Sequence, residues 1–235
     1  KLVGVAIIIG AFSLMMGLIT GLIGGTFGSI TTFNEANDGL APLFGAGTTS
    51  YDGYYGAQLA LTGTANLKFT VFGMEADDFN SIMYGQTFDA AGNPQNFIGL
   101  GNPDPANTNV WDPNGLGSFM VSNVAAGLID FSFANIAGFA KADNSSNGYA
   151  IANALPNFFL SIAGNAAATV GNSVWMFLDD SGGIGPSGGP NGDYDDLIVR
   201  MDVIPTTAPV PLPAAGVLLV GALGGLGLMR RRRTA

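Results

Sequence analysis

Short runs in which apolar and polar residues alternate are the feature that most constrains the fold of this chain. Leucine, phenylalanine and valine alternate with lysine and threonine over residues 67–71, and residues 197–203 repeat the same period of two. That period places successive side chains on opposite faces of a β-strand. No long stretch has the 3.6-residue period of an amphipathic helix, so the pattern predicts a chain built of strands.

Two further runs, residues 158–162 and 174–178, are apolar on both faces, as expected of central strands covered from two sides. A third run, residues 128–133, alternates less strictly but is rich in phenylalanine. Turn-forming residues separate these runs, as at 92–94 and 102–105. The sequence therefore predicts an all-β fold, an antiparallel β-sandwich of the jelly-roll-like type.

We expect this domain to span residues 30–205, after an apolar N-terminal segment at 1–29. Lys1 precedes an uncharged stretch from Leu2 to about Gly25, which predicts a signal peptide or an N-terminal anchor. About 24 helical residues would span roughly 36 Å, enough to cross a bilayer uncleaved. We favour the signal peptide, with Ser29 as the first mature residue.

The C-terminal end has three parts in a fixed order. Residues 206–213 form a proline-rich linker, and residues 214–235 form an apolar helix with a basic tail. The helix is slightly shorter than the roughly 20 residues that span a bilayer, and long arginine side chains can reach back to the headgroups. Arginines at this place stop transfer and hold the tail on the cytoplasmic side. These stop-transfer residues are Arg230, Arg231, Arg232 and Arg233.

The linker and helix carry the motif Val210, Pro211, Leu212, Pro213 and Ala214. Motif, helix and arginine cluster together resemble the C-terminal sorting signals that bacterial exosortases read, in the VPLPA variant of the PEP-CTERM group. The resemblance implies export, processing near the motif by an exosortase-like enzyme, and retention at the cell surface or release from it. An ordinary tail anchor without processing is the alternative.

The domain also resembles secreted proteins that commonly carry such a tail. The likeness rests on residues 69–76, on residues 127–133, and on 177–180 taken together with 193–199. It implies a β-domain of the cell surface or extracellular matrix, and it brings no set of catalytic residues. Extracellular polysaccharide is the partner class that this setting suggests.

Composition narrows the chemistry. The chain has no cysteine and no histidine, which excludes thiolate nucleophiles and removes the commonest general base and zinc ligand. Only Lys68, Lys141 and Arg200 lie between the apolar ends, against 17 acidic residues, so this part carries a net charge of −14. A nucleic-acid partner, which needs a basic surface, is therefore excluded.

A long acidic connection joins the last two predicted strands. Connections longer than about 12–15 residues are uncommon unless they are functional or disordered, and this one has aspartates at both ends. Pairing of the flanking strands as a hairpin would bring these carboxylates together, where a hard cation would offset their repulsion. Calcium, which takes six to eight oxygen ligands, is the predicted cofactor. The alternative is a solvated turn in which aspartates cap backbone N–H groups. The candidate ligands are Asp179, Asp180, Asp193, Asp195 and Asp196.

Other residues suggest weaker alternatives. A secreted carbohydrate-active enzyme that works through acidic residues alone would need a carboxylate pair about 5–9.5 Å apart, with Glu75, Asp77 and Asp78 as its nominal source. An acidic turn is the preferred reading of these three, and we predict no catalytic residues. Asn144 begins a three-residue glycosylation pattern that carries little weight.

Several aromatic residues suggest a place for sugar rings to stack, although we favour the reading that they fill the ends of the sandwich. They are Tyr51, Tyr54, Tyr55 and Trp111, the last in a predicted loop. The sequence thus predicts a non-catalytic, exported cell-surface or extracellular-matrix protein, ordered by calcium and anchored in the membrane as a precursor.

Overall fold

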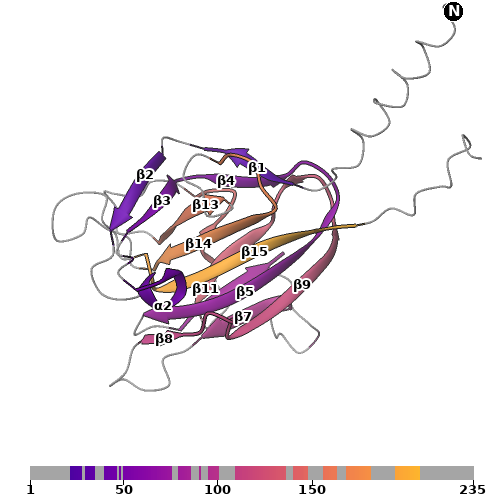
Figure 1. Cartoon of the computed structure of the whole chain (residues 1–235). Helices are drawn as coiled ribbons and strands as arrows, with labels where there is room; N and C mark the ends of the chain where they lie inside the picture. The colour runs from indigo at the N-terminus through magenta and orange to yellow at the C-terminus, as the bar shows by residue number, and fades with distance from the viewer. Residues whose placement is uncertain are drawn as a thin grey trace, which may run out of the picture.

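The chain folds into antiparallel β-sheets, which confirms the all-β prediction (Figure 1). In the described residues the one helix, α2 (Leu40–Phe44), is short, and none is long and apolar enough to cross a membrane. The computed structural model describes residues 22–27, 30–34, 40–46, 48, 50–75, 79–85, 90, 95–100, 109–135, 140–147, 156–162, 168–180 and 194–206. The predicted sorting motif at 210–214, the arginines at 230–233, and residues 1–21 lie outside this set.

The largest sheet has the strand order β2-β3-β13-β14-β15-β5, and β5 then pairs with both β8 and β9 at successive positions. The bounds in this order are β2 (Ile30–Asn34), β3 (Ser50–Tyr55), β13 (Asn157–Ile162), β14 (Ser173–Asp179), β15 (Leu197–Pro205), β5 (Ala65–Glu75), β8 (Asn109–Trp111) and β9 (Gly117–Val124).

Two smaller antiparallel sheets complete the described fold. The four-stranded sheet has the order β12 (Ala140–Asp143), β11 (Phe131–Asn135), β6 (Asn80–Tyr84) and β7 (Phe97–Leu100). The three-stranded sheet has the order β1 (Ile23–Thr26), β4 (Gln58–Leu61) and β10 (Gly127–Leu128).

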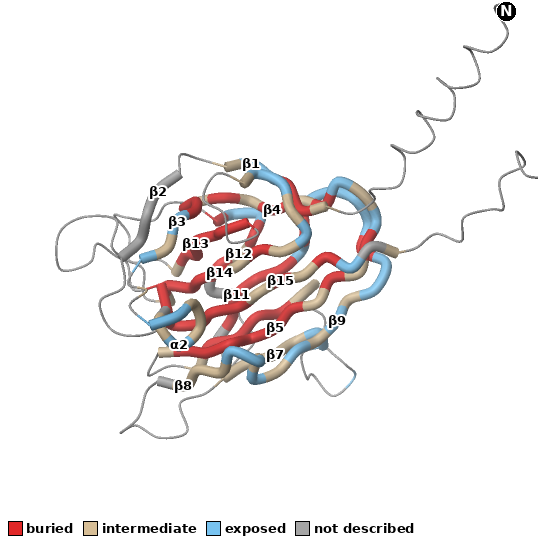
Figure 2. The backbone as a smooth tube through the Cα atoms, in the orientation of Figure 1, coloured by how far each residue is buried: buried red, intermediate tan, exposed pale blue. Residues whose placement is uncertain are grey.

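The side chains of β15 face opposite sides of the sheet in alternation, as the sequence predicts. Leu197, Val199 and Met201 of β15 lie in the main core, which draws residues from all three sheets, while Ile198 belongs to a second cluster on the other face. Figure 2 shows burial along β13, β14, β15 and β5, with exposed residues along β9. The central strands are therefore covered on both faces, as their continuous apolar runs require.

Phenylalanine rings join the four-stranded sheet to the large one. Phe131 and Phe133 of β11 lie with their ring centroids 5.4 and 5.2 Å from that of Phe158 on β13. Such contacts add to the stability gained from burying the rings themselves. The predicted run at 128–133 is split in the structure: β10 ends at Leu128, Ile129 is buried between, and β11 begins at Phe131.

Two buried asparagines connect the sheets. The side-chain amide of Asn144 donates to the carbonyl oxygens of Leu59 and Ile129, each at 2.8 Å, and its oxygen accepts the N–H of Leu59 at 2.8 Å. Asn147 makes the same kind of contact with Ala57 and Phe158. Asn144 has no exposed surface, so the glycosylation pattern that it begins is a structural feature and not an accessible modification site.

The N-terminal boundary differs from the expectation. Ile23–Thr26, inside the segment predicted as 1–29, form β1 and pair with Leu61 to Gln58 of β4. Ile23 is fully buried in the main core. The described fold therefore includes residues that precede the expected start at residue 30, because an apolar run inside the segment predicted as 1–29 forms a core strand. Cleavage before Ser29 would remove β1 from its sheet.

Candidate functional site

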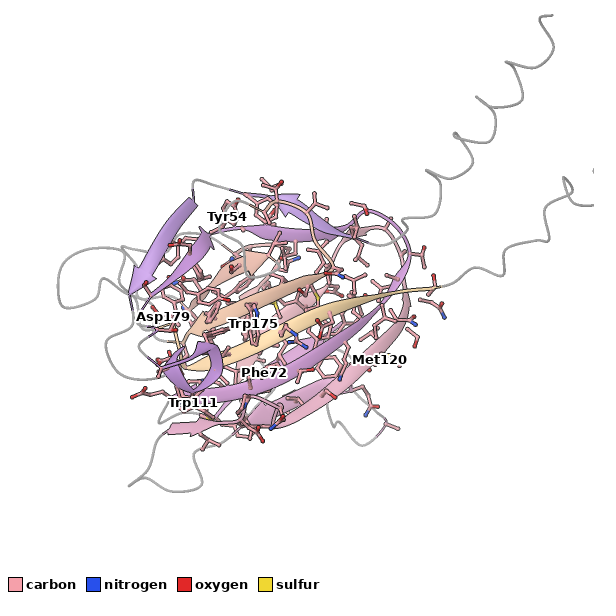
Figure 3. The ribbon with its side chains drawn as sticks, viewed as in Figure 1. Tyr54, Phe72, Trp111, Met120, Trp175 and Asp179 are labelled. Carbon is pink, nitrogen blue, oxygen red and sulfur yellow. The ribbon has the colours of Figure 1, made fainter. Side chains whose placement is uncertain are left out.

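The acidic end, defined as Asp179, Asp180, Asp195 and Asp196, lies where β14 ends and β15 begins. The antiparallel register pairs Leu178 with Leu197, so the two pairs of aspartates continue from directly opposed residues. This confirms that the flanking strands form a hairpin. Figure 3 shows Asp179 at one end of the large sheet. Asp193, the fifth predicted ligand, lies outside the described residues.

Hydrogen bonds fix the geometry of the acidic end. The backbone N–H of Asp180 donates to Oδ2 of Asp196 at 2.7 Å. The side-chain amide of Asn80 on β6 donates to Oδ2 of Asp180 at 2.6 Å. The N–H of Glu75, the last residue of β5, donates to the carbonyl oxygen of Asp195 at 2.9 Å. Residues at the ends of β5 and β6 and next to the ends of β14 and β15 are thereby held together at one end of the large sheet.

Three of these aspartates are buried, which is uncommon for charged side chains. Asp179, Asp195 and Asp196 are 1%, 0% and 8% exposed. Among the described basic side chains, Lys68 lies opposite Asp202 in the strand register and Arg200 pairs with the same residue. A buried carboxylate is costly unless cations or hydrogen-bond donors compensate its charge.

The chemistry of the donor set fits calcium, a hard cation that binds carboxylate and carbonyl oxygens. Within the part of the chain that the structure describes, no three acidic side chains form a group able to hold a metal ion. A complete site would therefore need further oxygen ligands from residues 181–193, the segment that includes Asp193. The described aspartates would form its strand-anchored half.

The sequence pattern missed several polar residues that surround the acidic end. Asn157 lies opposite Asp179 in the β13–β14 register, and its side-chain oxygen accepts a hydrogen bond from the hydroxyl of Tyr194. Asn80 on β6 is fully buried. Asn80 lies far from the acidic loop in the sequence, and Asn157 lies at the edge of an apolar run. Their one sequence signal is an asparagine at a strand end, which is also common in ordinary turns.

The predicted sugar-stacking residues are mostly inside the protein. Tyr54 is 2% exposed and belongs to the main core, and Tyr55 packs against Phe159 with ring centroids 4.9 Å apart. Trp111, expected in a loop, is the last residue of β8 and packs against the second cluster. Tyr54 and Tyr55 are therefore buried and not exposed for stacking on sugars, while their filling the ends of a sandwich stays a prediction.

A second aromatic group covers the outer face of the large sheet. Phe44 of α2 packs edge-on against Trp175 at 4.8 Å. The guanidinium carbon of Arg200 lies 5.2 Å from the ring centroid of Phe72 and 5.4 Å from that of Trp175. Its Nε donates to Oδ2 of Asp202 at 3.1 Å. Figure 3 shows Phe72 and Trp175 side by side on this face. Arg200 therefore covers aromatic surface as well as forming an ion pair.

Comparison with known protein families, with curated proteins and with solved structures finds no match to this chain.

Proposed function

We propose that this chain is an exported, non-catalytic protein of the cell surface or extracellular matrix, with a jelly-roll-like β-sandwich that calcium orders at its acidic end. The observation that carries the calcium proposal is the burial of Asp179, Asp195 and Asp196 at the end of one hairpin. The side chains of a plain solvated turn would lie in water, so the burial of these carboxylates supports an ordered arrangement that a divalent cation would stabilise.

Export and sorting rest on the sequence. The motif at 210–214, the apolar helix and the arginines at 230–233 follow the order of exosortase sorting signals. We propose an exosortase-like enzyme as the processing partner and extracellular polysaccharide as the surrounding matrix. Membrane insertion through the terminal segments would hold the precursor before processing.

The sorting proposal is tested in a producing cell by changing Pro211 and Pro213 to alanine. These positions follow the predicted domain in the sequence, so we expect the variant to fold normally while an unprocessed form accumulates. A matched control changes Pro156, which directly precedes β13, to alanine and leaves the motif intact. Normal maturation of the motif variant would contradict a motif-read signal.

The basic tail is tested by replacing Arg230 to Arg233 with neutral residues. Because these arginines stop transfer, their loss should reduce the retention of the precursor in the membrane fraction. An unchanged distribution between membrane and soluble fractions would contradict this interpretation of the tail.

A further inference from the structure

Both ends of the described domain are held by the turn between β4 and β5. The N–H of Leu22 donates to Oγ1 of Thr62 at 3.1 Å, and the N–H of Thr62 donates back to the carbonyl oxygen of Leu22 at 2.9 Å. The hydroxyl of Thr206 donates to the carbonyl oxygen of Thr64 at 3.4 Å. Figure 1 shows β1 beginning and β15 ending on the same side of the molecule. The two apolar terminal segments of the sequence therefore join the domain at one place.

This turn and four further segments around it form what we call the terminal pole. Gly171 exchanges two backbone hydrogen bonds with Ile23, and the N–H of Val203 donates to the carbonyl oxygen of Asn172. Strand pairing adds the β9–β10 connection to the same turn. None of the five segments contains a charged residue, although the chain carries a formal net charge of −9. The segments are 22–27, 61–66, 122–128, 168–173 and 203–206.

The terminal pole also exposes large apolar side chains. Leu128, Val170 and Ile204 are 53%, 52% and 41% exposed, and they come from three different segments of the pole. Single exposed apolar residues are normal on a protein surface. Here the exposed apolar side chains lie on an uncharged surface, close to the positions where both terminal segments join the domain. This combination suits an apolar or uncharged surrounding.

The acidic end lies at the opposite end of the large sheet. β15 runs from Leu197, beside the acidic end, to Pro205 at the terminal pole, and it has nine residues. At about 3.3 Å per residue, the two ends of the sheet are about 30 Å apart. The described domain therefore has an acidic end and an uncharged end on opposite sides.

Resting on the membrane anchoring proposed above, we infer that the terminal pole is a contact surface for a lipid bilayer. In the sequence, the apolar N-terminal stretch continues to Leu22 without a charged residue after Lys1. Residues 207–213 reach at most about 25 Å, so the second anchor also holds the pole near the membrane. Anionic headgroups repel acidic surfaces, and an uncharged surface with exposed leucine, valine and isoleucine avoids that cost. The acidic end then faces away from the bilayer.

The absence of cysteine from the chain permits a direct test. The full-length chain is reconstituted into phosphatidylcholine vesicles that contain phosphatidylglycerol, and a polarity-sensitive fluorophore is attached to single cysteines. Val170→Cys and Leu128→Cys report on the terminal pole. Leu116→Cys is the matched control, because Leu116 is apolar and 37% exposed but hydrogen-bonds through its N–H to Val71, away from the pole. Retained tryptophan fluorescence checks that each variant is folded.

Labels at Val170 and Leu128 should shift their emission to the blue and be quenched by nitroxide-bearing lipids, while the label at Leu116 responds to neither. Equal responses at all three positions would overturn the inference. A blue shift at the pole without lipid quenching would indicate a protein contact and would also overturn it. Flotation with vesicles distinguishes the anchoring proposal from the inference about the terminal pole. A chain that floats but lacks the quenching pattern supports anchoring and contradicts contact at the pole. A chain that does not float contradicts both.

Discussion

The backbone N–H of Asp180 donates a hydrogen bond of 2.7 Å to Oδ2 of Asp196, at the end of the β14–β15 hairpin where the long connection joins the two strands. This bond joins the two ends of the long acidic connection and holds one carboxylate in a fixed position. A carboxylate has two oxygens, each of which can accept hydrogen bonds or coordinate a cation. The geometry is thus compatible with a cation held between the hairpin ends.

Calcium should therefore raise the unfolding temperature of the protein, and Asp196→Asn should remove most of that rise. The amide oxygen of asparagine can still accept the N–H of Asp180, so the substitution chiefly removes the charge. A ligand at 100 times its dissociation constant stabilises a fold by about 2.7 kcal/mol. Thermal unfolding is followed by the fluorescence of Trp111 and Trp175, the two tryptophans of the chain, with calcium and then with excess chelator.

Asp130→Asn is the control for this experiment. Asp130 is an exposed carboxylate between β10 and β11, outside the acidic end. It carries the same charge as Asp196, so its loss should leave the calcium response unchanged. An equal loss of response in both variants would indicate a general charge effect. No response in the unmodified protein at millimolar calcium would contradict the metal proposal.

Asn144→Ala should destabilise the fold strongly. The substitution removes three buried hydrogen bonds and leaves the N–H and carbonyl of Leu59 and the carbonyl of Ile129 without that partner. The two carbonyls still accept the N–H groups of Ile129 and Phe131, so the N–H of Leu59 is the buried group left unsatisfied, and a loss of about 1–3 kcal/mol is expected. The midpoint of urea unfolding measures it. Ser145→Ala, an exposed change in the same turn, should stay within about 0.5 kcal/mol of the unmodified protein.

Much of the fold could be predicted because local pattern and final environment agree. The alternation in β15 and the continuous apolar runs in β13 and β14 identify the central strands without knowledge of their partners. β1 was assigned to a signal segment because an apolar run before a domain looks alike whether it enters a membrane or a core. Its place is decided by pairing with β4, a contact between residues far apart in the sequence that no local pattern records.

In the candidate site, too, some residues could be predicted from the local sequence and others could not. The aspartates could be predicted because a hairpin returns its two ends to one place, and both ends are visible in the sequence. Asn80 and Asn157 could not, since Asn157 reaches the acidic end through the pairing of β13 with β14, and Asn80 reaches it from the separate four-stranded sheet. The contribution of Trp111 was also missed: its ring packs where Gly73 of β5 has no side chain, and neither residue alone indicates the other.

This pairing gives a further prediction. An alanine Cβ at position 73 would overlap Cε3 of Trp111 and lie 2.5 Å from the carbonyl oxygen of Val110, which belongs to the backbone of β8. Because a backbone atom cannot rotate away, Gly73→Ala should force β5 and β8 apart and cost about 1–3 kcal/mol. A change in the emission of Trp111 should accompany the lower urea midpoint.

Gly24→Ala is the matched control, a buried glycine in a strand with room for a methyl group. Its Cβ would lie 3.8 Å from Cγ2 of Thr62 and 3.9 Å from the carbonyl oxygen of Thr169, both ordinary contacts. We expect Gly24→Ala to be neutral or stabilising by up to about 1 kcal/mol, since it reduces the entropy of the unfolded chain. Equal destabilisation by both substitutions would show that the contact with Trp111 and Val110 is not the cause.

The ring of Tyr51 predicts how stability depends on alkaline pH. Tyr51 packs against Phe44 and Phe177 with centroid distances of 4.5 and 5.1 Å, and burial raises its pKa from 10.0 to about 12. Between these two values the unfolded state loses the phenolic proton while the folded state keeps it. The folded state then binds more protons, so the free energy of unfolding falls as the pH rises through this interval. Below pH 10 the contribution is fully present.

Tyr51→Phe removes this titration and keeps the ring. The variant should therefore lose less stability than the unmodified protein as the pH rises from 10 to 12, with urea midpoints compared at each pH. Tyr84→Phe gives a useful comparison, because burial and, to a smaller extent, the charge of Asp130 also raise the pKa of Tyr84. Loss of the Tyr84 hydroxyl should also reduce the decrease in the free energy of unfolding between pH 10 and 12. Identical pH profiles for the Tyr51→Phe variant and the unmodified protein would contradict the assignment, since they would place the hydroxyl of Tyr51 in equally solvated surroundings in both states.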